Sequence, residues 1–200
     1  MTFMADQRID TNAQPGTTDT EVLMAGFGGQ GMLLAGKVLA QASMEIGKEV
    51  SWLPSYGPEM RGGTANVIVC IASTPIGSPL IESPRGLIVM NLPSLEKFAP
   101  KVKPGGVIVI NASLIDRDAH RDDCLVIKVD ARDLAQKAGA ARAANFVMLG
   151  TYAGAVDVVP AEAIEHAIEE EFAGDKAKFI PSSIAAFRAG YETGRQFRRD

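Results

Sequence analysis

The stretch from Pro54 to Gly63 is the part of the chain best suited to chemistry, because it combines backbone-bending residues with a phenol, a carboxylate and a guanidinium. Such mixtures are common in loops that present side chains for recognition. The planar donors of Arg61 suit a carboxylate or a phosphate, and Tyr56 suits stacking and hydrogen bonding. The alternative is an ordinary turn in which Glu59 and Arg61 form a weak surface salt bridge. We therefore take Ser55, Tyr56 and Arg61 as candidate ligand contacts.

A second candidate is a glycine turn of the form G-x-G-x-x-G, which joins an apolar run to a predicted helix. In that context backbone N–H groups and a helix N-terminus can receive an anionic group. A dinucleotide site also needs an acidic residue about 20 positions later, but the end of the next predicted strand reads Trp-Leu-Pro at 52–54. The pattern therefore favours close packing, or another anion, over NAD. The candidate contacts in the turn are Gly28, Gly29, Gln30 and Gly31.

Three further polar positions carry weaker signals. Asn91 follows an apolar strand and could face a ligand at the carboxyl edge of a sheet, or simply form a turn. His120 lies in an acidic loop and His166 on a polar helix face, and neither shows metal-ligand spacing or a nucleophile partner. We interpret both histidines as solvated surface, and the acidic run at 169–171 as a solvated helix end. No catalytic residue and no metal ligand are expected within this chain alone.

The elements that position these residues are predicted to alternate between strands and helices. Predicted strands cover 22–25, 49–53, 64–71, 86–90, 106–110 and 125–129, and a loop covers 54–63. Predicted helices cover 29–46, 93–98, 145–156, 161–172 and 182–197, with another that Asp130 caps. The strand at 64–71 follows the previous one too closely for a helical crossover, so we expect an antiparallel pairing there. The fold class is α/β, a Rossmann-like three-layer domain with a mostly parallel mixed sheet.

Composition limits the class of protein. The 200 residues are 46% hydrophobic and 22% charged, which suits one core, so we expect one domain at 21–200 behind a disordered tail at 1–20. A net charge of -4 does not indicate the basic patch or stripe that nucleic-acid-binding proteins usually carry. Two cysteines exclude a disulfide framework or a thiolate cage and indicate a reducing compartment. With neither an apolar run of about 20 residues nor a signal peptide, the protein is expected to be cytoplasmic, without a membrane partner.

Five segments together resemble the gamma subunits of 2-oxoacid:ferredoxin oxidoreductases, the pyruvate, ketoisovalerate and 2-oxoglutarate oxidoreductase gamma family. The two longest are Ala25 to Gly31 and Trp52 to Asn66, and the others are 76–79, 91–95 and 103–106. The resemblance covers the chain from about Val22 to its end, and the two long motifs are far more specific than the glycine turn alone.

The resemblance implies an oxidative decarboxylation in which a 2-oxoacid and coenzyme A give an acyl-CoA and CO2, with ferredoxin as the electron acceptor. It places thiamine diphosphate, Mg and iron–sulfur clusters in partner subunits: alpha, beta and a possible small ferredoxin-like delta subunit. The sequence agrees, because it has too few cysteines for a cluster and no Gly-Asp-Gly motif. We expect this chain to bind no cofactor by itself, and coenzyme A to be a co-substrate.

By the same resemblance the chain aids assembly and coenzyme A access. The hypothesis is that Gly28 to Gly31, Ser55 to Arg61 and Asn91 face the incoming coenzyme A or a partner subunit. The sequence of 52–63 resembles gamma subunits that serve 2-oxoglutarate or branched-chain 2-oxoacids more closely than those that serve pyruvate, so the resemblance favours the former substrates. Two alternatives stay open: an autonomous nucleotide-binding Rossmann-like protein, and a purely structural subunit.

Overall fold

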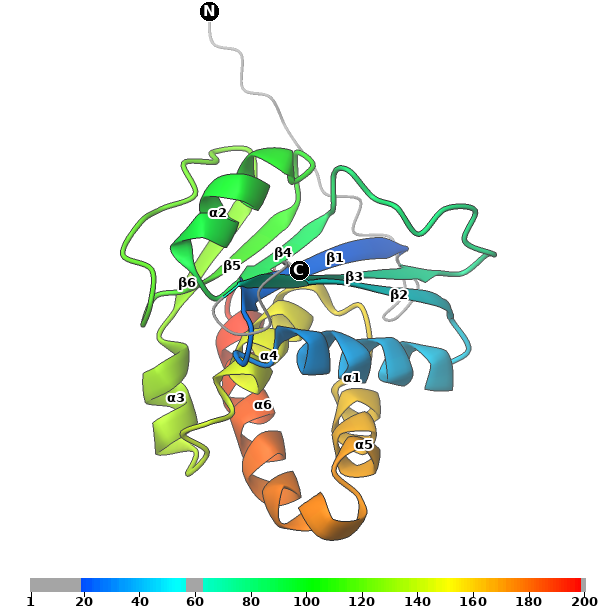
Figure 1. The fold of residues 1–200 in the computed structure, drawn as a ribbon, viewed down its shortest axis with the longest axis vertical. Helices are drawn as coiled ribbons and strands as arrows, with labels where there is room; N and C mark the ends of the chain where they lie inside the picture. The colour runs from blue at the N-terminus through cyan, green and yellow to red at the C-terminus, as the bar shows by residue number, and fades with distance from the viewer. Residues whose placement is uncertain (1–18, 57–62, 199–200) are drawn as a thin grey trace, which may run out of the picture.

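The structure, a computed structural model, describes residues 19–56 and 63–198, and within them one mixed sheet lies between two helical layers (Figure 1). The strands are β1 (Thr20–Phe27), β2 (Glu49–Tyr56), β3 (Thr64–Ala72), β4 (Gly86–Val89), β5 (Val107–Asn111) and β6 (Leu125–Val129). The helices are α1 (Met32–Glu45), α2 (Leu92–Phe98), α3 (Ala131–Lys137), α4 (Ala144–Val156), α5 (Ala161–Glu171) and α6 (Ile180–Arg195), with short 3-10 helices η1 (Ala99–Lys101) and η2 (Gly174–Phe179).

The sheet has the strand order β2-β3-β1-β4-β5-β6. Strands β1, β4, β5 and β6 run parallel, whereas β3 is antiparallel to both β1 and β2. The predicted mostly parallel mixed sheet and the predicted antiparallel pairing of the strand that begins at Thr64 are confirmed. The sheet order itself was not predicted, and β3 inserts between β1 and β2, so the strand after α1 is not the neighbour of β1.

The parallel half of the sheet is buried on both faces, as expected for continuous apolar strands. Every residue of β4 and β5 is buried. Ile88 and Val109 face the core beneath α1 and α4, while Leu87 and Ile108 face the core beneath α2. Figure 1 shows α2 on one side of the sheet and α1, α4, α5 and α6 on the other.

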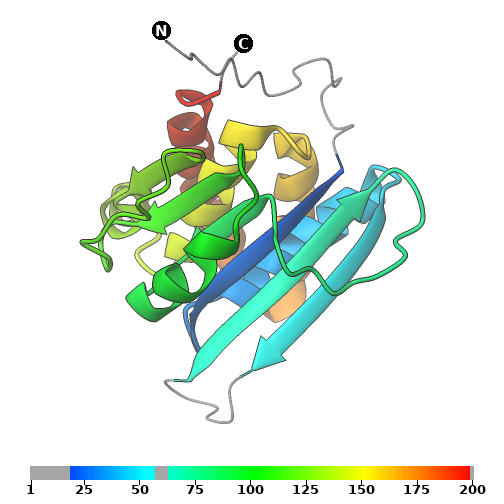
Figure 2. The same cartoon turned by 90° about the horizontal axis from the view of Figure 1, so that it is seen from above.

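The antiparallel half is covered by α1 on one face, and its other face is more open (Figure 2). Two predicted boundaries are corrected here. Pro54, Ser55 and Tyr56 belong to β2 and not to a loop, because β2 is an edge strand, where a residue without an N–H is tolerated. Thr20, assigned to the tail, begins β1 and is buried, whereas the rest of the predicted tail, 1–18, lies outside the described residues.

Helices α4 and α6 pack backbone to backbone. A methyl group at Gly150 would collide with the carbonyl oxygen of Phe187, and one at Gly190 with that of Val147. Gly154 and Gly194 make equally close approaches. Glycine at these positions lets two helices approach closely, which larger residues would prevent.

Helices α1 and α5 share an apolar core, in which Ile164, Ala167 and Ile168 of α5 are fully buried, and charged and polar side chains join them at its rim. Lys37 Nζ lies 2.5 Å from Glu171 Oε2, and His166 Nδ1 lies 3.0 Å from Glu45 Oε2. The side-chain amide of Gln41 also donates to Glu170. The interpretation of 169–171 as a simple solvated helix end is therefore wrong for Glu170 and Glu171, which reach across to α1.

Among the described residues, no helix combines the length and the apolar character needed to cross a membrane.

Candidate functional site

The candidate site lies at the carboxyl ends of β1 and β4, where the chain leaves the sheet in opposite directions. After β1 it enters α1 on one face, and after β4 it enters α2 on the other face (Figure 1). Ligands of open α/β sheets bind in the crevice at such a switch point. The side chain of Gln30 in the glycine turn contacts Met90, the residue before Asn91, so the structure brings together two sets of residues that the sequence predicted separately.

The glycine turn is closed by its own hydrogen bonds. The backbone N–H of Phe27 donates to Gln30 Oε1 at 2.6 Å, and that of Gly28 donates to the carbonyl oxygen of Gly63 at 3.0 Å. The N–H of Gln30 donates to the carbonyl oxygen of Phe27 at 3.1 Å. Because these three donors are occupied, the turn provides less of a phosphate cradle than its sequence pattern suggests.

Gln30 also joins the ends of β1 and β4. Its side-chain amide donates to the carbonyl oxygen of Met90 at 3.4 Å. A methyl group at Gly26 would lie 2.6 Å from Gln30 Oε1, so glycine is needed there for this side chain to fold over the turn. The position of Gln30 explains the glycine spacing by packing, which is one of the two roles weighed from the sequence.

Gly29 and Gly31 adopt positive φ angles of 94° and 75°, which glycine accommodates without strain. Gly31 precedes α1, and Asn145 Nδ2 donates to its carbonyl oxygen at 3.2 Å. Gly29 is exposed, and an added Cβ would meet nothing within 4 Å. Gly29 is therefore the residue of the turn best placed to contact a ligand or a partner.

Asn91 is an N-cap. Its Oδ1 accepts from the N–H of Ser94 at 2.8 Å at the start of α2, and the residue is 4% exposed. Asn91 Nδ2 and Ser94 Oγ are buried and have no hydrogen-bond partner among the described residues. Asn111, at the end of β5, lies next to this pair, with its Nδ2 3.3 Å from Met90 Sδ. Asn91 therefore has a local structural role at the start of α2, and its amide is buried.

Ser55 and Tyr56 reach the same edge from the outer strand. Tyr56 pairs with Ala65, which pairs with Gly26, so two strand spacings of about 4.8 Å each separate Tyr56 from the turn. Tyr56 is 70% exposed, and Ser55 is also exposed. Arg61 and Glu59 lie outside the described residues.

At the far end of the same edge, Asp130 caps α3 as predicted by accepting from the N–H of Asp133 at 3.0 Å. The Ser113 hydroxyl also donates to Asp130, and this hydrogen bond holds the pKa of its carboxyl below the ordinary value. Asp130 is therefore an ionised structural group at neutral pH.

The two cysteines do not form a metal site. Cys70 is buried in β3 and Cys124 precedes β6, and both thiols are free. Burial raises the pKa of each thiol, so neither is a ready thiolate. Two such thiols cannot supply the four thiolates of a typical iron–sulfur cluster.

A second hollow, of about 440 Å³, lies on the α2 side of the sheet. Leu23, Ile68 and Phe98 provide apolar lining, and Asn66 and Lys101 provide polar lining. Sequence reasoning did not anticipate it, because these residues come from four separate elements and share no motif.

His120 is exposed in a loop, as expected, with a positive φ of 50°. His166 is exposed too but pairs with Glu45, a residue 121 positions away. That partner could not be found from sequence spacing.

Comparisons with known proteins agree with the resemblance. The family model described as pyruvate ferredoxin/flavodoxin oxidoreductase matches residues 21–193. Ketoisovalerate oxidoreductase subunit VorA of Methanothermobacter thermautotrophicus is 39% identical over 96% of this chain, which spans only 40% of that relative's length. 2-Oxoglutarate synthase subunit KorC of Methanocaldococcus jannaschii is 32% identical, with 88% of this chain and 94% of the relative covered.

Solved structures show the same fold. The gamma subunit of a keto/oxoacid ferredoxin oxidoreductase from Geobacter sulfurreducens has a TM-score of 0.79 at 26% identity, covering 92% of this chain and all of that one. A 2-oxoglutarate:ferredoxin oxidoreductase from Magnetococcus marinus, with 2-oxoglutarate, coenzyme A and succinyl-CoA bound, has a TM-score of 0.78 at 20% identity and shares the fold over 90% of this chain and 32% of that one. The chain belongs to the pyruvate ferredoxin/flavodoxin oxidoreductase family, among the gamma subunits of 2-oxoacid:ferredoxin oxidoreductases.

Proposed function

We propose that this chain works as the gamma subunit of a coenzyme A-dependent 2-oxoacid:ferredoxin oxidoreductase, where it aids assembly and borders the path by which coenzyme A reaches the active site. The observation that carries the proposal is the gathering of the longest family segments at one edge of the sheet. The ends of β1 and β2, the start of β3 and the start of α2 all lie there. A surface that contacts other subunits or coenzyme A is expected to combine separate segments at one edge of the sheet.

The proposed reaction is the oxidative decarboxylation of 2-oxoglutarate or a branched-chain 2-oxoacid to the acyl-CoA and CO2. Two relatives reported above are named as a ketoisovalerate oxidoreductase subunit and a 2-oxoglutarate synthase subunit, which makes these two classes of 2-oxoacid the first to test. Thiamine diphosphate, Mg and the clusters would be held by alpha, beta and delta partners, in keeping with the two free thiols of this chain.

Coenzyme A contact is proposed at the exposed part of the edge. The Magnetococcus marinus enzyme has coenzyme A bound, which makes this ligand the first to test. Since Phe27, Gly28 and Gln30 use their N–H groups within the protein, the contact is assigned first to Gly29, Ser55 and Tyr56. The phenol of Tyr56 suits stacking on a ring and hydrogen bonding.

The first experiment isolates the chain from its native host and assays the co-purified material for thiamine diphosphate, iron and coenzyme A-dependent oxidation of three 2-oxoacids. Large cofactor-bearing partners, with highest activity on 2-oxoglutarate or a branched-chain acid, are expected. Recovery of the chain alone, without cofactors or activity, would contradict the proposal and favour an autonomous nucleotide-binding protein.

The second experiment separates coenzyme A contact from a purely structural role. In the purified complex, Tyr56→Ala is compared with Phe179→Ala, which removes an exposed aromatic ring from η2 in the helical layer. We expect Tyr56→Ala to raise the KM for coenzyme A by roughly tenfold, the effect of about 1.4 kcal/mol of lost binding, with assembly unchanged. Normal kinetics with reduced assembly of the Tyr56 variant would instead support a subunit interface.

A further inference from the structure

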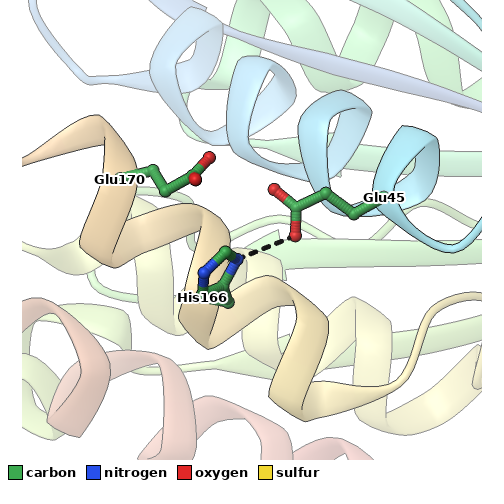
Figure 3. Close-up of side chains that lie close together, drawn as sticks. All are labelled: Glu45, His166 and Glu170. Atoms are coloured by element: carbon green, nitrogen blue, oxygen red, sulfur yellow. Dashed lines mark hydrogen bonds and ion pairs between the residues drawn. The ribbon is translucent and has the colours of Figure 1, made fainter.

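Three potential metal ligands meet on the outside of the helical layer, away from the candidate site. Glu45 is the last residue of α1, while His166 and Glu170 lie one turn apart on α5. Figure 3 shows the three side chains pointing into the gap between the two helices. One ligand atom from each lies within 4.8 Å of the other two.

We propose that Glu45, His166 and Glu170 bind one divalent transition-metal ion, which joins α1 to α5. The donor set is one imidazole nitrogen and two carboxylate oxygens, and both ligand types bind Zn²⁺ in proteins. Atoms bound to one Zn²⁺ in tetrahedral geometry at about 2.0 to 2.2 Å lie about 3.3 to 3.6 Å from each other. The most separated ligand atoms here must therefore approach each other by up to about 1.5 Å, through rotation of the exposed glutamate side chains, and water completes the coordination.

The carboxylates are held in place by a neighbour that is not itself a ligand. Gln41 lies one turn before Glu45 on α1, and its side-chain amide donates to Glu45 Oε1 at 3.4 Å and also to Glu170. This amide connects the two carboxylates across the helix gap. Partners of this kind orient metal ligands and contribute to metal affinity.

The local charge also favours a cation. The carboxylates of Glu45 and Glu170 lie beside the imidazole of His166, and Glu45 Oε2 is 3.0 Å from His166 Nδ1. The nearby cation on α1, Lys37, is paired with Glu171.

The test uses the tag-free full chain and Zn²⁺ alone, measured by isothermal titration calorimetry near neutral pH after removal of bound metals with a chelator. His166→Ala and Glu170→Gln remove ligands. The matched controls are His120→Ala, which removes the only other histidine, and Glu169→Gln, which removes the same charge one residue away. Circular dichroism establishes that each variant is folded, and the isosteric Glu45→Gln is a third ligand variant.

We expect one Zn²⁺ per chain, an affinity loss of more than about tenfold in each ligand variant, and changes below about twofold in the controls, since even outer-shell changes cost about tenfold. Gln41→Leu should fall between the two groups. Absence of saturable binding would overturn the proposal. An equal loss in Glu169→Gln would also overturn it, because the attraction would then be diffuse and not ligation. A loss confined to His120→Ala would place the metal elsewhere and overturn it too.

Discussion

The two halves of the sheet are stabilised by different kinds of contact. The parallel half, β1 and β4 to β6, is backed by α4, which packs against α6 through glycines that bring the two helix backbones into direct contact. The antiparallel half, β2 and β3, is backed by α1, which α5 covers with its buried apolar face and with ion pairs and hydrogen bonds at the rim of that contact. The candidate site lies where the two halves meet, at the ends of β1 and β4.

This difference indicates in which half of the sheet substitutions will cost the least stability. Apolar burial and backbone packing contribute most of the free energy of folding, whereas exposed ion pairs contribute little each. The parallel half therefore acts as the rigid support. The antiparallel half has a half-open face and an exposed edge strand, and it offers surface for other subunits at modest cost in stability.

Ile88→Ala and Ile68→Ala compare the two halves directly. Ile88 in β4 is fully buried, whereas Ile68 in β3 is only half-buried on the open face. We expect Ile88→Ala to lower the free energy of unfolding by about 2–5 kcal/mol, and Ile68→Ala by less than half as much. Urea unfolding measures both. Equal losses would show that the antiparallel half is as tightly packed as the parallel half.

Gly190→Ala tests the helix pair behind the parallel half. Its methyl group would collide with the carbonyl oxygen of Val147, so α4 and α6 must separate. Overpacking of this kind costs about 1–3 kcal/mol, partly offset by the better helix propensity of alanine. Gly77→Ala is the control, because a Cβ there meets nothing within 4 Å, and it should change stability by less than about 0.5 kcal/mol. Similar thermal midpoints for both variants would contradict the close packing.

Asn91→Ala tests the boundary between the halves. It removes the cap of α2 and should cost about 1 kcal/mol. Asn91→Ser keeps a capping oxygen and removes the amide nitrogen that lacks a partner among the described residues, so it should lose less than half as much. If serine and alanine destabilise equally in urea unfolding, the capping hydrogen bond is not the main contribution of Asn91.

Much of the fold could be predicted from the sequence, because the strands of the parallel half are continuous apolar runs. Gly86 to Met90, for example, can be identified as a strand from its own residues. The antiparallel pairing followed from the short connection before Thr64. The sheet order could not be predicted, since nothing local to β3 shows that it inserts between β1 and β2. Pro54 indicated a loop, although at a sheet edge its missing N–H costs nothing.

The segments that form the candidate site could be predicted from the sequence, but their arrangement in space could not. The turn and Asn91 were identified from residue type and position, and the structure places them together. The side chain of Gln30 occupies donors and acceptors that the glycine pattern alone left free. The pairing of His166 with Glu45 depends on α5 lying beside α1, which the sequence does not show, and the four-residue spacing of His166 and Glu170 on α5 was a signal that sequence reasoning missed.

The smallest expected effect is a pH dependence in the helix pair behind the antiparallel half. The hydrogen bond and charge of Glu45 raise the pKa of His166 in the folded chain. Below the ordinary histidine pKa of about 6.5 the imidazole is protonated in both folded and unfolded chains, so the ion pair contributes fully. As the pH rises through the raised pKa of the folded state, the proton is lost and the contribution disappears. The thermal midpoint of the native chain should therefore exceed that of Glu45→Gln most at about pH 5.5 and least at about pH 9, with a chelator present throughout to exclude metal. Added salt should reduce the difference, because the pair is exposed. A difference that is the same at every pH would mean that Glu45 acts through packing or hydrogen bonding alone, and the ion pair would then add nothing to the apolar contact between α1 and α5.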